Sequence, residues 1–353
     1  MRHRAILPID RCGTGLTGIF FFPKVAGCPD MNHAIPTKRI FEKLLSARRH
    51  LLVSHRKPDG DTLGGMMAVY NWLRDQGREA YAFCVDAPSA AYSYFPRIRE
   101  VQSKPETFQD EAIDMVCVFD AGDLQYAGID AFVAAMPKRP FIANFDHHVT
   151  NTLFGDANLV VTEASSTAEV VHAFFIANDV EVTRPMATCL MTGLLTDTSN
   201  FSNPATTVKS LEIASDLLLK GVSMRDITRR LMRNKPVAAL KLWGLALERL
   251  RWDEAKKTAT TALFLKDLAE HPVDDEHLEG LSNFLNHILK ADVVLVLKET
   301  KDGKVKGSYR SATDVDVAEL AKTYGGGGHK KAAGFTVAGT IGDHADGWKV
   351  MTE

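Results

Sequence analysis

The sequence has few cysteines, almost no net charge and no long apolar run, and each absence excludes a class of protein. Its five cysteines lie far apart without a CxxC pair, which argues against a disulfide framework and favours a reducing compartment. No apolar run approaches the roughly 18 residues that a transmembrane helix needs. With a formal net charge of -2, the chain lacks the global basic field that binds long nucleic acid non-specifically. We therefore expect a cytoplasmic protein without a membrane partner, and a small or short anionic substrate is compatible with this charge.

The length of 353 residues suggests two domains, each large enough to bury its own core. A hydrophobic share of 45% and a charged share of 24% are ordinary for a globular protein. Changes in the residue pattern predict an irregular N-terminal extension over 1–34, a first domain over 35–203, a helical linker over 204–235, a second domain over 236–340 and a loose tail over 341–353. We assign no function to the extension.

The stretch over residues 54–65 organises the first domain. It follows a short buried strand and precedes an apolar helical pattern, so that His55, Asp59 and Asp61 crowd a single strand-to-helix turn. Turns of this kind form the edge at which α/β folds place their chemistry. Two carboxylates this close repel and raise each other's pKa unless a cation lies between them. For this stretch alone, an Asp-Gly turn with a helix N-cap is the alternative.

Other strands end on similar residues. After a strand over 79–85, a strand over 114–119 ends on Asp120, and a strand over 141–145 ends on the Asp-His-His triplet 146–148. Helical patterns separate these strands, and this alternation predicts a mostly parallel sheet with helices on both faces. Because the carboxyl ends of parallel strands lie side by side, these polar residues should meet at one edge of the sheet.

Two helix ends add to this pattern. A buried helix that begins at Pro185 ends on Asp197, where a carboxylate opposes the helix dipole and a cation would explain its position. Residues 166–169 (Ser-Thr-Ala-Glu) form a capping box that opens a helix through Ala177. A structural cap is the default interpretation of this box, and phosphate contact by the exposed amides is an additional role that it would permit.

Together the sheet edge offers carboxylates and imidazoles without thiolates: His55, Asp59, Asp61, Asp120, His147, His148 and Asp197. This donor set suits a divalent ion such as manganese, with magnesium, cobalt or iron as competitors. It is larger than one ion needs, and a pair of ions about 3.5–4 Å apart would use all of it. Such a pair generates hydroxide near neutral pH and neutralises phosphoryl charge, as a phosphoester hydrolase requires. Each residue alone could be a core histidine or a turn aspartate, but four separate segments end in this way.

The second domain is predicted as a smaller α/β domain with a hairpin at Asp302-Gly303. Four glycines at 325–328 precede His329 and Lys330, and successive glycines can turn their N–H groups toward an anion. Upstream, Ser308 and Arg310 lie on the neighbouring predicted strand, and the Arg310 guanidinium can bind a phosphate through two hydrogen bonds. A flexible linker is the alternative for the glycine run taken alone.

These residues resemble the successive motifs of the DHH phosphoesterase superfamily. The motifs are His55-x-x-Pro58-Asp59-Gly60-Asp61, the strand-ending Asp120, Asp146-His147-His148 and Thr196-Asp197; Gly325–His329 with Lys330, Ala332, Ala333 and Gly334 looks like the signature of the DHH-associated C-terminal domain. The resemblance covers about residues 35–340. Within the superfamily, the compact two-domain layout is similar to the nanoRNase branch of oligoribonucleases and pAp phosphatases.

The resemblance implies an active-site cleft between the two domains and specific residue roles. Manganese ligands are implied at His55, Asp59, Asp61, Asp120, His147 and Asp197; the catalytic group consists of His148 near the scissile phosphate, Asp120, and Asp146 orienting its neighbours; substrate binding is assigned to Ser308, Arg310, Gly326, Gly327, Gly328, His329 and Lys330. The implied substrates are short RNA oligonucleotides, cleaved to mononucleotides, and the nucleotide bisphosphate pAp, converted to AMP. The implied cofactor is Mn²⁺, as two ions, with Mg²⁺ or Co²⁺ as substitutes.

Alternatives within the superfamily are a cyclic-dinucleotide phosphodiesterase and a single-strand DNA exonuclease, although no extra nucleic-acid-binding domain is seen. The glycine–histidine loop argues against the inorganic pyrophosphatase branch. An alternative of another class is a nucleotide-binding sensor without catalysis. The pattern also permits a homodimer.

Overall fold

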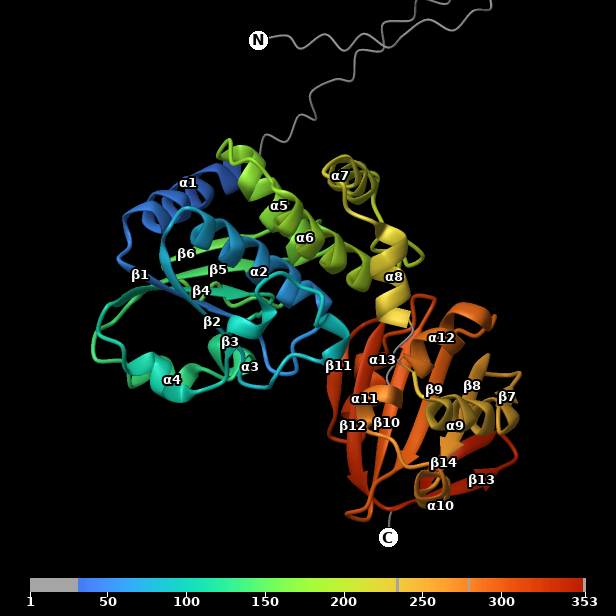
Figure 1. Ribbon diagram of the computed structural model, residues 1–353. Helices are drawn as coiled ribbons and strands as arrows, with labels where there is room; N and C mark the ends of the chain where they lie inside the picture. The colour runs from blue at the N-terminus through green and yellow to red at the C-terminus, as the bar shows by residue number, and fades with distance from the viewer. Residues whose placement is uncertain (1–30, 233–234, 279, 352–353) are drawn as a thin grey trace, which may run out of the picture. The chain divides into compact units, whose positions relative to one another are not determined.

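The computed structural model describes residues 31–232, 235–278 and 280–351. The chain divides between Thr228 and Arg229 into two compact units, coloured blue to yellow and yellow to red in Figure 1. Residues 1–30 of the predicted extension over 1–34 lie outside the described residues. Its last residues belong to a helix, α1 (Met31–Ser46), so the prediction of irregular structure is wrong for 31–34.

The first unit contains a six-stranded, entirely parallel sheet in the order β3-β2-β1-β4-β5-β6. Its strands are β1 (Arg49–Val53), β2 (Glu79–Phe83), β3 (Val101–Gln102), β4 (Ile113–Phe119), β5 (Phe141–Asp146) and β6 (Ala157–Val160). The prediction of a parallel sheet is confirmed, while the short edge strands β3 and β6 were missed. The strand order reverses between β1 and β4, and such a switch point is where open α/β sheets bind ligands.

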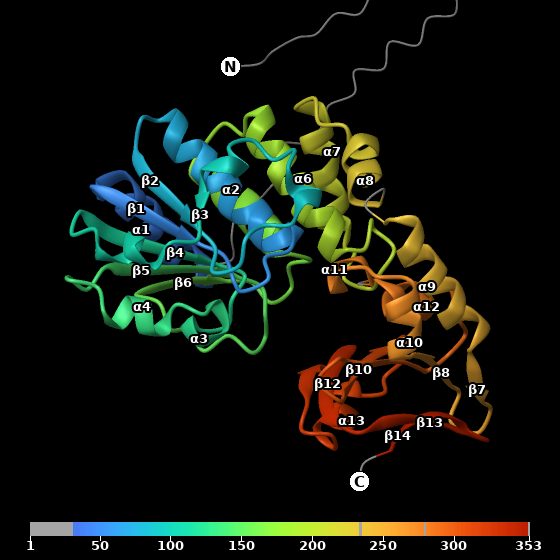
Figure 2. The same cartoon turned by 60° about the horizontal axis from the view of Figure 1, so that its bottom comes forward.

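Helices cover both faces of this sheet, with α3 and α4 on the face opposite α2 (Figure 2). Besides α1, the unit contains α2 (Gly60–Asp75), α3 (Leu124–Ala127), α4 (Asp130–Ala134), α5 (Thr167–Ala177), α6 (Arg184–Asp197) and α7 (Val208–Leu219), and α8 (Met224–Met232) spans the division between the two units. On one face Leu51 packs in a cluster with Ala127 and its neighbours. On the other, the Phe41 ring of α1 stacks on Trp72 and meets Phe174 edge-on. Because both faces are buried, the central strands β1, β4 and β5 are mostly apolar instead of alternating between polar and apolar residues.

Helices α2 and α6 approach so closely that two glycines are needed at their crossing. A Cβ on Gly64 would lie 2.7 Å from the carbonyl oxygen of Cys189, and a Cβ on Gly193 would lie 2.5 Å from the Cβ of Ala168 and 2.8 Å from Asp61 Oδ1. The crossing therefore brings the N-terminal turn of α2, with Asp61, against α6 and the first turn of α5. This packing sets the geometry of the polar site described below.

Helix α7, which the sequence analysis placed in a linker, packs against α6. Its Ile213, Ala214 and Leu217 side chains are buried. The helix therefore belongs to the first unit, and the predicted linker over 204–235 is too long. Its apolar positions recur at helical spacing, a pattern that identifies a buried face without naming the surface that covers it.

The second unit is built on a mixed six-stranded sheet in the order β11-β12-β10-β9-β8-β7. Its strands are β7 (Arg251–Asp253), β8 (Thr258–Leu263), β9 (Val293–Glu299), β10 (Lys304–Ser311), β11 (Gly327–His329) and β12 (Ala332–Ala338); its helices are α9 (Val237–Glu248), α10 (Leu265–Glu270), α11 (Asp275–Leu278), α12 (Leu281–Ile288) and α13 (Val317–Lys322). Among the described strands of this sheet, β8 and β9 alone pair in parallel. The predicted smaller α/β domain is confirmed. Helix α12 begins after Gly280, which adopts a φ of 91°.

The prediction of a loose tail over 341–353 is wrong for its described part. Strands β13 (Thr340–His344) and β14 (Gly347–Met351) form an antiparallel hairpin. Trp348 is only 8% exposed, and its indole N–H donates to the carbonyl of Arg249 at 2.6 Å. Trp348 anchors this hairpin, and Ile341 and Val350 pack against the same core cluster. Each strand has only five residues, which is a short pattern for sequence reasoning to detect.

The glycine run is ordered rather than an open loop. Gly325 (φ 70°) follows the end of α13, its N–H donating to the carbonyl of Lys322, and Gly327–His329 forms the edge strand β11. A Cβ on Gly326 would lie 2.2 Å from the carbonyl oxygen of Gly334, so this glycine is required by packing. The expected anion cradle and the expected cleft between the domains stay predictions. Among the described helices, none has both the length and the apolar character that a membrane span requires.

Candidate metal centre

The predicted ligands of the first unit come together at the switch point of its sheet. Asp59 is the N-cap of α2, and its Oδ1 accepts hydrogen bonds from the amides of Asp61 (2.9 Å) and Thr62 (3.1 Å). The capping role that served as the alternative interpretation of this stretch is therefore real. It engages Oδ1 of Asp59, while the side chain remains about half exposed.

Asp61 is completely buried and is held by the N-terminus of α5. The amides of Thr167 and Ala168 donate to its two carboxylate oxygens at 2.6 and 2.9 Å. These amides are therefore engaged by a carboxylate of the same chain, and the phosphate contact considered for them is replaced by this internal one. The capping box is also shifted, because the carboxylate of Glu169 accepts from the amide and hydroxyl of Ser165 instead of the amide of Ser166.

Asp120 lies at the centre of the cluster. Its backbone has a φ of 57°, in the left-handed region, and its amide donates to the carbonyl of Phe145 at 2.9 Å. The carboxylate lies 3.4 Å from Nε2 of His55, 3.6 Å from Nε2 of His147 and 3.5 Å from Nδ1 of His148. A strained backbone at a buried carboxylate is typical of a functional site.

Two imidazoles are oriented by backbone carbonyls so that Nε2 faces the carboxylates. Nδ1 of His55 lies 2.6 Å from the carbonyl oxygen of Arg56, and Nδ1 of His147 lies 3.2 Å from that of Ala164. Since a carbonyl only accepts, each Nδ1 carries a proton, and Nε2 is the nitrogen whose lone pair becomes available when the imidazole is neutral. This arrangement of the second ring nitrogen is the one that metal-binding histidines use.

His148 is oriented differently. Its Nδ1 donates to Oδ1 of Asp146 at 2.7 Å, and the same oxygen accepts from the amides of His147 (2.8 Å) and His148 (3.3 Å). Oδ2 of the fully buried Asp146 accepts from the side-chain amide of Asn151 at 2.5 Å, and Asn151 is held in turn by Asn144. Asp146 therefore positions its neighbours. Sequence reasoning missed both asparagines, and Asn144, a polar residue inside an apolar strand, was the available signal.

The possible ligand atoms form three groups, and within each group they all lie within 4.8 Å of one another. The groups are Asp120 with His147 and His148; His55 with Asp59 and Asp120; and Asp61 with His147 and Asp197. The carboxylate of Asp197, at the end of α6, lies 3.5 Å from Nε2 of His147. The second and third groups share no residue. The structure thus brings all six predicted ligands to one place, although they come from the turns after β1, β4 and β5 and from the ends of two helices.

The buried carboxylates of the cluster outnumber the groups that could neutralise their negative charge, and this raises several pKa values. Burial raises the pKa of Asp61 well above its usual range, and the carboxylates of Asp120 and Asp197 add to this. Burial likewise raises the pKa of Asp197 to about 7, against the opposing effect of His147. Burial lowers the pKa of His55, but the hydrogen bond and charge of Asp120 outweigh it and raise the value to about 9. Protons therefore partly neutralise these carboxylates, and a divalent ion with oxygen and imidazole ligands would do so better.

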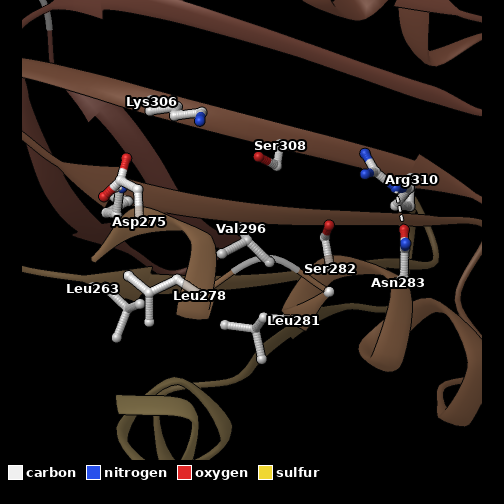
Figure 3. A pocket seen from close by; sticks show the side chains of 12 residues that line it. Leu263, Asp275, Leu278, Leu281, Ser282, Asn283, Val296, Lys306, Ser308 and Arg310 are labelled. Carbon is white, nitrogen blue, oxygen red and sulfur yellow. Dashed lines mark hydrogen bonds and ion pairs between the residues drawn. The ribbon is translucent and has the colours of Figure 1, made fainter. Parts of the chain in front are cut away.

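In the second unit, two of the predicted substrate-binding residues line a pocket of about 330 Å³ (Figure 3). Ser308 and Arg310 alternate along β10 and face this pocket with Lys306. None of the described residues among Gly326, Gly327, Gly328 and Lys330 is part of its lining. Lys330 is exposed and lies 3.5 Å from the carboxylate of Asp314. The side chain of His329 lies outside the described part of the chain.

Two family models match the chain: the DHH family, N-terminal domain, over residues 49–194, and the DHHA1 domain over residues 258–345. The bifunctional oligoribonuclease and PAP phosphatase NrnA of Thermus thermophilus is 32% identical over 294 residues, which cover 83% of this chain and 86% of that relative. The chain belongs to the DHH family. Its matched N-terminal range contains every predicted ligand except Asp197, which follows three residues later.

The fold is also that of a solved structure, an exopolyphosphatase-related protein from Bacteroides fragilis. The two superpose with a TM-score of 0.81 over 87% of this chain and 92% of that one, at 24% identity. A probable manganese-dependent inorganic pyrophosphatase of Streptococcus mutans is 24% identical over 216 residues, 59% of this chain and 62% of that protein. The donor set and these relatives support a divalent-metal site in this member of the DHH family.

Proposed function

We propose that this DHH-family chain hydrolyses short oligoribonucleotides to mononucleotides and converts pAp to AMP. The observation that carries the proposal is the gathering of six carboxylate and imidazole ligands at the switch point of the parallel sheet, within 4.8 Å in groups of three. The name of the Thermus relative supports the choice of substrate. The proposal places catalysis in the first unit and substrate binding in the pocket of the second.

The residues present fit a pair of divalent ions, and we propose Mn²⁺, with Mg²⁺ or Co²⁺ as substitutes. His55 with Asp59 and Asp61 with Asp197 are separate ligand pairs, while Asp120 contacts the histidine of each half. Asp120 is therefore suited to bridge two ions. When bound, such ions lower the pKa of a water that they hold and neutralise charge on phosphoryl oxygens.

In this scheme His148 supplies the proton to the leaving oxygen, and Asp146 orients His148. Asp146 holds a proton on Nδ1 of His148, and its hydrogen bond and charge raise the pKa of this imidazole to about 9 although burial opposes the rise. A protonated His148 can donate a hydrogen bond to a phosphoryl oxygen and supply a proton to the leaving oxygen through Nε2. Asp146 serves as the positioning residue.

The first experiment compares hydrolysis of RNAs of two to about seven nucleotides, pAp and a cyclic dinucleotide, each with added Mn²⁺ and with a chelator. The Asp120→Asn variant should lose activity by orders of magnitude, because it removes the central charge and retains the shape. The Asp130→Asn variant changes an exposed residue outside the cluster and serves as the control.

Preferential cleavage of dinucleotides and pAp supports the proposal. Activity on the cyclic compound alone would replace it by cyclic-dinucleotide turnover, and nucleotide binding without hydrolysis of any probe would replace it by a sensor. Near-normal activity of Asp120→Asn would contradict the mechanism.

A further inference from the structure

Exposed apolar side chains gather beside the metal centre of the first unit. Between residues 46 and 175, all of which the structure describes, the exposed large apolar side chains are those of Tyr126, Val149 and Leu153, at 57%, 78% and 61%. Tyr126 follows β4 and the other two follow β5, and these neighbouring strands also supply Asp120 and the two adjacent histidines. Exposed apolar side chains that gather in one place commonly mark a binding site.

The two turns that carry these side chains are joined to each other. The amide of Thr152 donates to the carbonyl of Gly122 at 2.9 Å. The side-chain amide of Asn151 donates to the carbonyl of Ala121 at 3.3 Å. The turns after β4 and β5 therefore form one connected rim at the carboxyl edge of the sheet, next to the predicted metal ligands.

Tyr126 is the part of this rim that meets a predicted metal ligand. Its ring centroid lies 5.5 Å from that of His55, with an angle of 51° between the two ring planes. Burial raises the pKa of the phenol, and the charges of Asp120, Asp59 and Asp146 add to the rise, so the side chain lies within the field of these carboxylates. More than half of the residue is nevertheless open to solvent. The ring therefore has surface left for a ligand that is bound at the metal centre.

The backbone around Tyr126 is fixed. Its amide, in the single-turn helix α3, donates to the carboxylate of Asp123 at 2.6 Å. Gly128 ends the helix in the left-handed region with a φ of 76°. Ala127 and Ile129 are fully buried in the core on this face of the sheet. A ring on a fixed backbone has little conformational freedom to lose on binding, which makes it a suitable contact surface.

The position of the ring limits which part of a substrate it can contact. A phosphoester that is cleaved at the metal centre lies beside His55, and the nucleoside attached to it then reaches the neighbouring ring of Tyr126. Nucleobases stack on aromatic side chains, and this stacking accepts any base because every base has a π-face. Tyr126 carries no positive charge, so it suits a base better than a second phosphate.

We propose that Tyr126 stacks on the nucleobase of the nucleotide whose phosphoester is cleaved. The first unit then holds a base as well as the reacting phosphate. Tyr126 is a specificity residue in this scheme, because it makes the enzyme prefer a nucleotide to the bare sugar phosphate. The inference rests on the proposed function and adds a base subsite in the first unit.

The test is the ratio of kcat/KM for pAp to that for ribose 3,5-bisphosphate, which is the same molecule without adenine. Tyr126→Ala should lower this ratio about tenfold, as expected for the loss of one stacked base, while activity on the base-free compound changes little. The dinucleotide ApA is compared in the same way with its two analogues that each lack one base. The analogue that shows the same effect identifies the stacked nucleotide.

Three controls accompany this comparison. Tyr126→Phe keeps the ring and should keep most of the preference for the base. Trp252→Ala removes another half-exposed aromatic side chain, on the second unit, and should leave the ratio unchanged. Titration of Tyr126→Ala with Mn²⁺ should give an affinity close to that of the wild-type protein.

The outcomes separate the two proposals. If the wild-type protein cleaves neither the dinucleotide nor pAp, the proposed function fails and the inference fails with it. If it cleaves them without preferring the base-bearing compound, or if Tyr126→Ala retains that preference, the stacking role is refuted and the proposed function stands. Equal losses on base-bearing and base-free compounds would show that the ring only positions His55, and a Tyr126→Phe variant as impaired as Tyr126→Ala would assign the effect to the hydroxyl. Both results would also refute stacking.

Discussion

At the scale of single residues, the metal centre depends on groups that are not themselves ligands. The hydroxyl of Thr167 donates to Oδ1 of Asp120 at 2.9 Å, while its backbone amide donates to Asp61. One residue at the start of α5 therefore fixes two carboxylates. Partners of this kind commonly change metal affinity by about 10–100-fold when removed.

Replacing Thr167 by valine should weaken Mn²⁺ binding by about tenfold or more, because Asp120 loses a hydrogen bond that orients it. The backbone contact to Asp61 would be retained. Calorimetric titration of the metal-free protein with Mn²⁺ measures the effect. Thr167→Ser keeps the hydroxyl and should bind almost normally; equal affinity of the valine and serine variants would contradict this role.

The same cluster predicts how the stability of the metal-free protein varies with pH. The pKa is raised by folding to about 7 for Asp197, and to about 9 for both His55 and His148. The folded state therefore binds more protons than the unfolded state from roughly pH 4 to 9, and the free energy of unfolding should fall as pH rises through this window. A bound divalent ion needs deprotonated ligands, so its stabilising effect should grow with pH.

Urea denaturation at pH 6 and pH 8, with a chelator and with Mn²⁺, tests this prediction. The difference between the urea midpoint with Mn²⁺ and the urea midpoint with chelator should be larger at pH 8 than at pH 6. Comparing the midpoints at the same pH cancels the contribution of titrating groups elsewhere in the chain. A gap that narrows at pH 8 would show that these groups do not titrate as inferred.

At the scale of secondary-structure elements, the crossing of α2 and α6 determines whether the ligands meet. Gly193 lets the backbone of α6 approach both Asp61 and the first turn of α5. The chain therefore uses glycine inside a helix, where it costs about 1 kcal/mol relative to alanine. The benefit is contact between three elements that each present part of the site.

Changing Gly193 to alanine should destabilise the protein by about 1–3 kcal/mol and weaken metal binding, because the new methyl group would overlap Ala168 and Asp61. Gly244→Ala is a matched control in helix α9, where a Cβ would meet no atom within 4 Å. That variant should be neutral or stabilised by up to about 1 kcal/mol. Urea denaturation and Mn²⁺ titration measure both, and a fully stable Gly193→Ala protein with normal metal affinity would contradict the prediction.

At the scale of the whole molecule, the chain consists of two units with separate cores. The second unit is closed by the hairpin β13–β14, whose Trp348 belongs to the same cluster as Leu297 and Phe335. The hairpin lies far along the chain from every predicted metal ligand. Damage to it should therefore leave metal binding intact.

Trp348→Ala should cost the second unit about 3–5 kcal/mol, as for other buried aromatic residues, while Mn²⁺ affinity of the first unit stays close to normal. Calorimetry resolves the two unfolding transitions, and metal titration measures the first unit. Trp252→Ala, which removes a half-exposed tryptophan from the same unit, is the control and should cost much less. Loss of metal binding in Trp348→Ala would show that the units do not fold independently.

The sequence by itself determined the parallel sheet of the first unit and the ligand residues at its carboxyl edge. This was possible because strand period and strand-ending polar residues are local patterns, and because parallel order forces the ends of β1, β4 and β5 to one side. The hairpin around Trp348, the place of α7 and the ordered glycine run escaped prediction, since each depends on which distant surface covers a short segment. Only the tertiary structure decided how the ligands are oriented, through the amides of α5 on Asp61 and the asparagines behind Asp146. These contacts join residues far apart in the chain, and no local pattern records them.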